Sequence, residues 1–71
     1  MHYFVEIYDD SNNHVGTRSL RADTEVNAKS EARAILAMLP TFVDWTVRLF
    51  IQPERENYRE LCDFRRFADN A

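Results

Sequence analysis

The stretch "FVDWTVRLFIQP", residues 42–53, is the most informative part of the sequence because it is apolar on both faces of a single expected strand. Alternate residues of a strand point to the same face. One face of this strand carries five apolar side chains: Val43, Trp45, Val47, Leu49 and Ile51. Phe42 and Phe50 lie on the opposite face among polar residues. The pattern therefore predicts a sheet strand that needs cover on both sides.

Two further strands are expected before it. In residues 2–8, Tyr3, Val5 and Ile7 share one side and the remaining residues share the other, which predicts a strand. The turn-forming segment "DDSNN" follows. A second strand is expected over residues 15–22, with Gly16 indicating a bulge or an unusual turn angle. The two strands together predict a hairpin.

The segment "ADTEVNAKSEARAILAMLP" predicts a helix over residues 24–39. Asp23 or Thr24 is a suitable N-cap, and Pro40 ends the helix. One helical face is apolar and consists of Ala28, Ala32, Ile35, Leu36 and Leu39. The charged residues Lys29, Glu31 and Arg33 are expected on the solvated side.

The order strand, strand, helix, strand predicts an α+β domain with a three-stranded antiparallel sheet, ββαβ, in the order 2-1-3, and the third strand over residues 42–52. Parallel pairing of the third strand beside the second is the alternative. The helix of residues 24–39 is expected to cover an inner layer made of Tyr3, Val5, Ile7, Trp45, Val47 and Leu49. All 71 residues form one domain.

The C-terminal segment predicts a second helix over residues 54–68. Tyr58, Leu61, Phe64 and Ala68 would share one side of it, although Arg65 interrupts that side. A hairpin strand from about Tyr58 to Phe67 is the alternative.

Four aromatic residues are expected on the outer face of the sheet, away from the first helix: Phe4, Tyr8, Phe42 and Phe50. One possibility is that the tail folds back over them and makes a third layer. Otherwise a partner covers them, either a second copy in a homodimer or a different protein, because a large exposed aromatic patch is uncommon on a monomer.

Composition and charge narrow the functional classes. The chain is 45% hydrophobic and 13% aromatic, which argues against disorder, and its net charge of −3 disfavours direct nucleic-acid binding. Cys62 is the single cysteine, so no intramolecular disulfide forms. No apolar run has the length of a membrane span, and the expected location is the cytoplasm, that of the host cell if the protein is phage-encoded.

The sequence offers little for catalysis. His2, His14 and Cys62 have no metal-ligand spacing, so no metal is expected. With Gly16 as the single glycine there is no glycine-rich loop for a phosphate, and no cofactor is expected. We expect a non-enzymatic protein.

Two sets of charged residues are candidates for protein interaction. The first set is acidic and lies in two expected loops: Asp9, Asp10, Asp23 and Glu25. Such carboxylates attract a basic surface and can stand in for phosphates. The second set forms an arginine stripe on the expected C-terminal helix, Arg55, Arg59 and Arg66, which is also the candidate for an accessory nucleic-acid contact.

The length, the acidity and the hairpin-helix-strand order of residues 3–52 resemble small phage-encoded proteins, among them anti-CRISPR inhibitors. The resemblance is one of general pattern and includes no diagnostic motif. It implies a stoichiometric binder without a cofactor that blocks a basic nucleic-acid site or a subunit contact of a larger complex. A homodimeric assembly protein is the alternative function.

Overall fold

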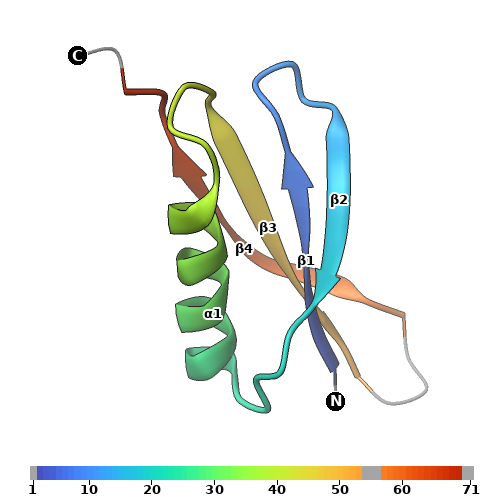
Figure 1. Cartoon of the computed structure of the whole chain (residues 1–71). Helices are drawn as coiled ribbons and strands as arrows, with labels where there is room; N and C mark the ends of the chain where they lie inside the picture. The colour runs from blue at the N-terminus through green and yellow to red at the C-terminus, as the bar shows by residue number, and fades with distance from the viewer. Residues whose placement is uncertain (1, 54–56, 70–71) are drawn as a thin grey trace.

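A four-stranded sheet with one helix on one face makes up the protein (Figure 1). The computed structural model describes residues 2–53 and 57–69. The elements in chain order are β1 (His2–Tyr8), β2 (His14–Ser19), α1 (Glu25–Met38), β3 (Trp45–Gln52) and β4 (Arg59–Arg66). Neighbouring strands are all antiparallel, in the order β2-β1-β3-β4. The first three strands therefore take the expected order, and β3 pairs with β1.

Helix α1 begins and ends where its flanking residues dictate. The Thr24 hydroxyl accepts a hydrogen bond from the Asn27 N–H at 3.2 Å, which makes Thr24 rather than Asp23 the N-cap. At the other end the Leu39 N–H donates to the Leu36 carbonyl, and Pro40 follows. The short side chains near the start of α1 let it approach the sheet closely.

The core lies between α1 and the sheet. Val5, Val47 and Leu49 of the two central strands are fully buried, and the small residues Ala28 and Ala32 of α1 are fully buried against them. The remaining core residues are Tyr3, Leu20, Ile35, Leu36 and Ile51, with Ile7, Leu39, Trp45, Leu61, Cys62 and Phe64 partly buried around them. The expected inner layer is therefore correct.

The predicted C-terminal helix over residues 54–68 is wrong. Residues Arg59–Arg66 form β4, which pairs with β3 along its free edge. Without β4, β3 would leave a row of backbone donors and acceptors unpaired beside its fully buried Val47 and Leu49. The alternative expectation, a hairpin strand from about Tyr58 to Phe67, is the one that the structure supports.

A bulge in β4 explains why its sequence resembled a helix. Glu60 pairs with Phe50, but Cys62 pairs with the next β3 residue, Leu49, so Leu61 is the extra residue. The bulge turns Glu60 to one face of the sheet and Cys62 to the other. Period-two alternation is therefore lost in the middle of the strand.

Phe42 does not belong to the sheet. Strand β3 begins at Trp45 rather than at residue 42, and Phe42 lies in the preceding turn with 78% of its surface exposed. Its expected place on the outer face is wrong because the strand parity cannot be extended back through the turn.

Candidate functional site

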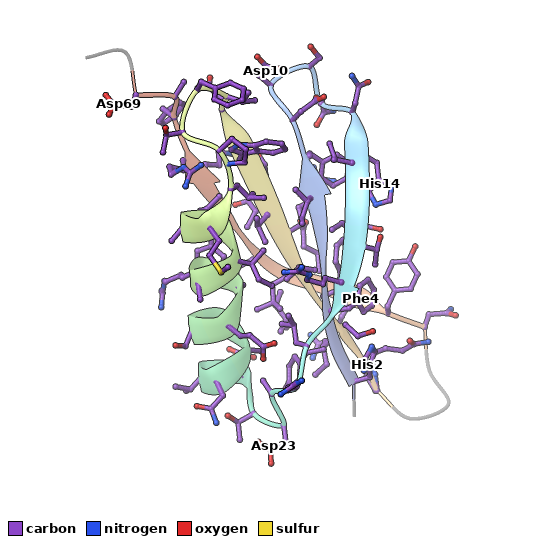
Figure 2. The ribbon with its side chains drawn as sticks, in the orientation of Figure 1. His2, Phe4, Asp10, His14, Asp23 and Asp69 are labelled. Carbon is purple, nitrogen blue, oxygen red and sulfur yellow. The ribbon has the colours of Figure 1, made fainter. Side chains whose placement is uncertain are left out.

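The sheet face opposite α1 is the best candidate for a functional surface, and we call it the open face (Figure 2). No described element packs over it, because α1 lies on the other side. Strand register and alternation place on it Phe4, Glu6, Tyr8, His14, Thr17, Thr46, Arg48, Phe50, Glu60, Asp63 and Arg65. The expectation that Phe4, Tyr8 and Phe50 point away from the helix is consistent with this register.

Three aromatic rings form a cluster at one end of the open face, and we call it the aromatic cluster: Phe4, Phe50 and Tyr58. Phe4 and Phe50 are cross-strand partners whose rings stack at 5.1 Å between centroids. The Tyr58 ring meets both edge-on, at 5.6 Å from each. Phe50 is only 7% exposed, whereas Tyr58 is 57% exposed. Tyr58, which immediately precedes β4, thus covers the Phe4 and Phe50 rings, and the C-terminal segment does not form a third layer over the sheet.

Charged residues of alternating sign run across the open face beside the aromatic cluster. Arg48 of β3 lies between its cross-strand partners Glu6 of β1 and Asp63 of β4. Its guanidinium approaches the Glu60 carboxylate to 3.4 Å and lies 5.0 Å from the centre of the Tyr8 ring. Arg48 is therefore held in place by neighbours on both flanking strands, β1 and β4.

Tyr8 donates a hydrogen bond from its hydroxyl to the Glu6 carboxylate at 2.8 Å. This hydrogen bond raises the pKa of the Tyr8 phenol; desolvation and the Glu6 charge raise it further, and Arg48 opposes the change. The phenol is thus a neutral donor at physiological pH. It is positioned to orient Glu6 rather than to act as a base.

In the first acidic loop, the Asp9 carboxylate forms its hydrogen bonds within the turn itself. Asp9 accepts hydrogen bonds from the backbone N–H groups of Ser11 and Asn13, each at 2.9 Å. These bonds, that of Asn13 first, hold the pKa of Asp9 below its ordinary value. Asn12 takes the left-handed backbone conformation that the turn requires, with φ of 61°. Asp10 is exposed, so it is the better candidate of the two for an external contact.

The second acidic loop lies at the other end of the molecule. Asp10 and Asp23 mark the two ends in Figure 2, and the longest dimension of the protein is 44 Å. Glu25 forms an ion pair with Lys29 at 3.1 Å one helical turn away. The structure therefore does not bring the four predicted acidic residues together into one surface.

The predicted arginine stripe is also separated. Arg59 and Arg66 lie at the two ends of β4 instead of on one helical face, and Arg55 lies outside the described residues. Arg66 points toward α1 and donates to the carbonyls of Leu36 at 2.6 Å and Leu39 at 2.6 Å. A third bond reaches the Pro40 carbonyl at 2.7 Å. Arg66 thus caps the C-terminus of α1 and has a structural role.

Glu31 also has a structural role, which the sequence did not predict: it anchors the loop before α1 to the helix. It was expected on the solvated side of the helix, but its carboxylate accepts hydrogen bonds from the backbone N–H groups of Arg21 and Ala22 at 3.1–3.2 Å. These bonds fix the connection between β2 and α1. No sequence signal reports a contact of this kind, because it depends on where the loop meets the helix.

Little in the described part of the chain resembles a reaction centre. Within residues 2–53 and 57–69, no three or more His, Cys, Asp or Glu side chains gather in a way that could hold a metal ion. Cys62 is half-buried beneath α1, and burial raises the pKa of its thiol. The thiol is thus a poor nucleophile in the folded protein.

Comparison with protein-family models, with curated proteins and with solved structures gives no match for this chain. Among the described residues, no helix has the length and apolar character needed to cross a membrane. Any function must therefore be argued from the surface of the molecule itself.

Proposed function

We propose that this protein is a non-enzymatic binding module that contacts another protein through the open face. The observation that carries the proposal is the aromatic cluster, in which the exposed Tyr58 ring stands over the stacked rings of Phe4 and Phe50. Tyr, Phe and Arg are enriched in the buried centre of protein interfaces. The cluster combines an apolar anchor with a hydroxyl group that can pair with a partner.

The surroundings of the aromatic cluster support the same function. The exposed rim holds Arg48 and Arg65 together with Glu60 and Asp63, and both arginines are already paired, at 3.4 and 3.7 Å. A rim with balanced charge suits a protein surface better than the phosphate backbone of a nucleic acid. Prearranged side chains also lose less entropy when a partner binds.

The finer form of the proposal is a phage-type inhibitor that covers a surface of a larger complex. Of the two targets expected for it, a subunit-contact surface suits the aromatic cluster better than a basic nucleic-acid site. An acidic mimic of phosphates would need its carboxylates on one face, but Asp10 and Asp23 lie at opposite ends of the molecule. Of these two residues, Asp10 is the one in the hairpin turn beside the open face.

A homodimer through the open face is the second candidate. The row of Glu6, Arg48 and Asp63 alternates in sign across three strands. In a twofold pairing of two such faces, acidic groups of one copy can meet Arg48 of the other. The solution mass at increasing protein concentration distinguishes a dimer from a monomer that needs a different partner.

Two matched variants test the proposal. Tyr58→Lys places a charge in the aromatic cluster, whereas Phe42→Lys makes the same kind of change at an exposed aromatic residue outside the open face. Each immobilised variant is exposed to host lysate, and a retained partner is then measured in purified form. We expect Tyr58→Lys to weaken binding at least about 30-fold and Phe42→Lys to leave it unchanged. Equal binding by the two variants would contradict the proposal.

A further inference from the structure

Helix α1 leaves one strand of the sheet uncovered on its own side. It contacts β1, β3 and β4 but not β2, which forms the edge of the sheet (Figure 1). A groove of about 310 Å³ lies between the helix and this edge. Its walls include Ile35, Met38 and Leu39 of α1, Ile7 of β1, and Gly16 and Arg18 of β2. The groove is on the opposite side of the sheet from the aromatic cluster.

Gly16 keeps the floor of this groove open. It pairs with Ile7, whose side chain faces α1, so a side chain at position 16 would point into the groove. A Cβ atom built on Gly16 meets no heavy atom within 4 Å. Met38, on the helix side, is 83% exposed. An apolar side chain from another molecule therefore has room over Gly16 and an apolar wall beside it.

The backbone of β2 is available along the same edge. The Leu20 N–H donates to the Tyr3 carbonyl at 2.9 Å, and hydrogen-bonded pairs alternate along an antiparallel ladder. Thr17 and Ser19 therefore direct their N–H and C=O groups away from β1, toward the free edge. In the opposite edge strand, β4, five of the eight residues of "RELCDFRR" are charged, and such charges discourage strand addition. In β2, "HVGTRS", Arg18 is the single residue of the types Asp, Glu, Lys and Arg.

Arg18 determines which kind of partner fits. It is the one charged residue among the described residues that line the groove, and it faces the same side as Gly16. Antiparallel pairing of β2 with β2 of a second copy would bring no carboxylate to Arg18, because residues 14–19 contain no Asp or Glu. A segment of a different protein with an acidic side chain complements it.

We propose that β2 and this groove bind an extended segment of another protein as a fifth strand. The segment pairs its backbone with Thr17 and Ser19, places an apolar side chain over Gly16, and places a carboxylate against Arg18. Gly16 and Arg18 are two positions apart on one face, so the apolar and acidic residues of the segment are also two positions apart. This second binding site goes beyond the proposed function, since it uses neither the aromatic cluster nor the open face.

A phage-displayed library of random linear peptides, selected on the intact protein, tests the proposal. We expect enriched peptides with an apolar and an acidic residue two positions apart. Gly16→Leu fills the groove without a clash at its Cβ, and the backbone angle of Gly16 is not in the left-handed region, so we expect the fold to be retained. Affinity for the enriched peptides should fall more than tenfold in Gly16→Leu. The affinity should fall by a similar factor in Arg18→Glu. Because Arg18 is exposed, this variant provides the test even if Gly16→Leu does not fold.

The result for Tyr58→Lys separates this site from the open face. Peptides bound at β2 should bind Tyr58→Lys as well as they bind the unaltered protein. The absence of enriched peptides, or full affinity in both Gly16→Leu and Arg18→Glu, would overturn the proposal. So would a dimer that Gly16→Leu dissociates, because the edge would then pair with a second copy.

Discussion

Replacing Arg66 with alanine should destabilise the protein far more than replacing its neighbour Arg65. The Arg66 guanidinium donates three hydrogen bonds of 2.6, 2.6 and 2.7 Å to carbonyls at the end of α1. A hydrogen bond from a charged donor contributes roughly 1.5–3 kcal/mol, and a cation at a helix C-terminus adds about 0.3–1 kcal/mol. Water replaces part of this in the variant, so we expect a net loss of about 2–4 kcal/mol.

Such a loss is a large share of the total stability. A chain of 71 residues has an unfolding free energy of roughly 4–10 kcal/mol. At about 4–8 °C per kcal/mol, the melting temperature of Arg66→Ala should fall by at least about 8 °C. Arg65 is the matched control, because its side chain is 66% exposed and forms one weak ion pair with Asp63 at 3.7 Å. Arg65→Ala should change stability by less than about 0.5 kcal/mol.

Urea unfolding followed by tryptophan fluorescence measures both variants. Trp45 is the one tryptophan of the chain, and its indole N–H donates to the Pro40 carbonyl, which also accepts from Arg66. The probe therefore reports directly on the end of α1. Equal stabilities of Arg66→Ala and Arg65→Ala would refute the assignment of Arg66 as the helix cap.

Four further predictions concern single residues. Phe50→Ala should cost about 3 kcal/mol in thermal unfolding, because the ring is 7% exposed; a loss below about 1 kcal/mol would contradict its place in the aromatic cluster. Glu31→Ala should cost about 1–2 kcal/mol in urea unfolding, because two backbone N–H groups lose their acceptor; no change would contradict the anchor. The pKa of Asp9 in the folded protein lies below its ordinary value of 3.8. The ionised carboxylate therefore stabilises the hairpin at pH values above 3.8, and this stabilisation is lost as the pH falls through the folded-state pKa. The stability difference between the unaltered protein and Asp9→Asn should therefore vanish in acid, and a constant difference would contradict this. Cys62 should react with a thiol reagent more slowly in the folded than in the urea-unfolded protein, and equal rates would contradict its burial.

The central part of the fold was predictable because its strands follow simple periodicity. Alternation in β1 and β3 correctly separated Val5 and Val47 from Phe4 and Phe50. Helix α1 was predictable from its cap and its apolar face. These features depend on residues that are close together in the sequence, so one amino-acid sequence is sufficient to predict them.

The C-terminal strand was not predictable as the first choice because two local features hide it. The bulge at Leu61 reverses the parity of β4, so apolar residues fall at a spacing that also fits a helix. Arg66 then occupies an inward position, where an apolar residue is the usual sign of a strand. Its partners are backbone carbonyls about 30 residues away, and no local pattern reports them.

The candidate site was predictable only in part for the same reason. Strand alternation correctly placed Phe4, Tyr8 and Phe50 on the open face. Phe42 could not be distinguished from them, because the sequence does not show that β3 begins only at Trp45. The grouping of Arg48 with Glu6 and Asp63 requires the strand register, which the sequence does not contain.

The most direct test of the open face as a protein-contact surface is hydroxyl-radical footprinting of Tyr58, with Phe42 as the internal control. Both side chains are exposed in the isolated protein, at 57% and 78%. In dilute purified protein both should be labelled, whereas in cell lysate labelling of Tyr58 should fall and that of Phe42 should not. Protection that appears in purified protein only at high concentration would indicate a homodimer. Equal labelling of Tyr58 in lysate and in dilute purified protein would contradict the assignment of the open face as a protein-contact surface.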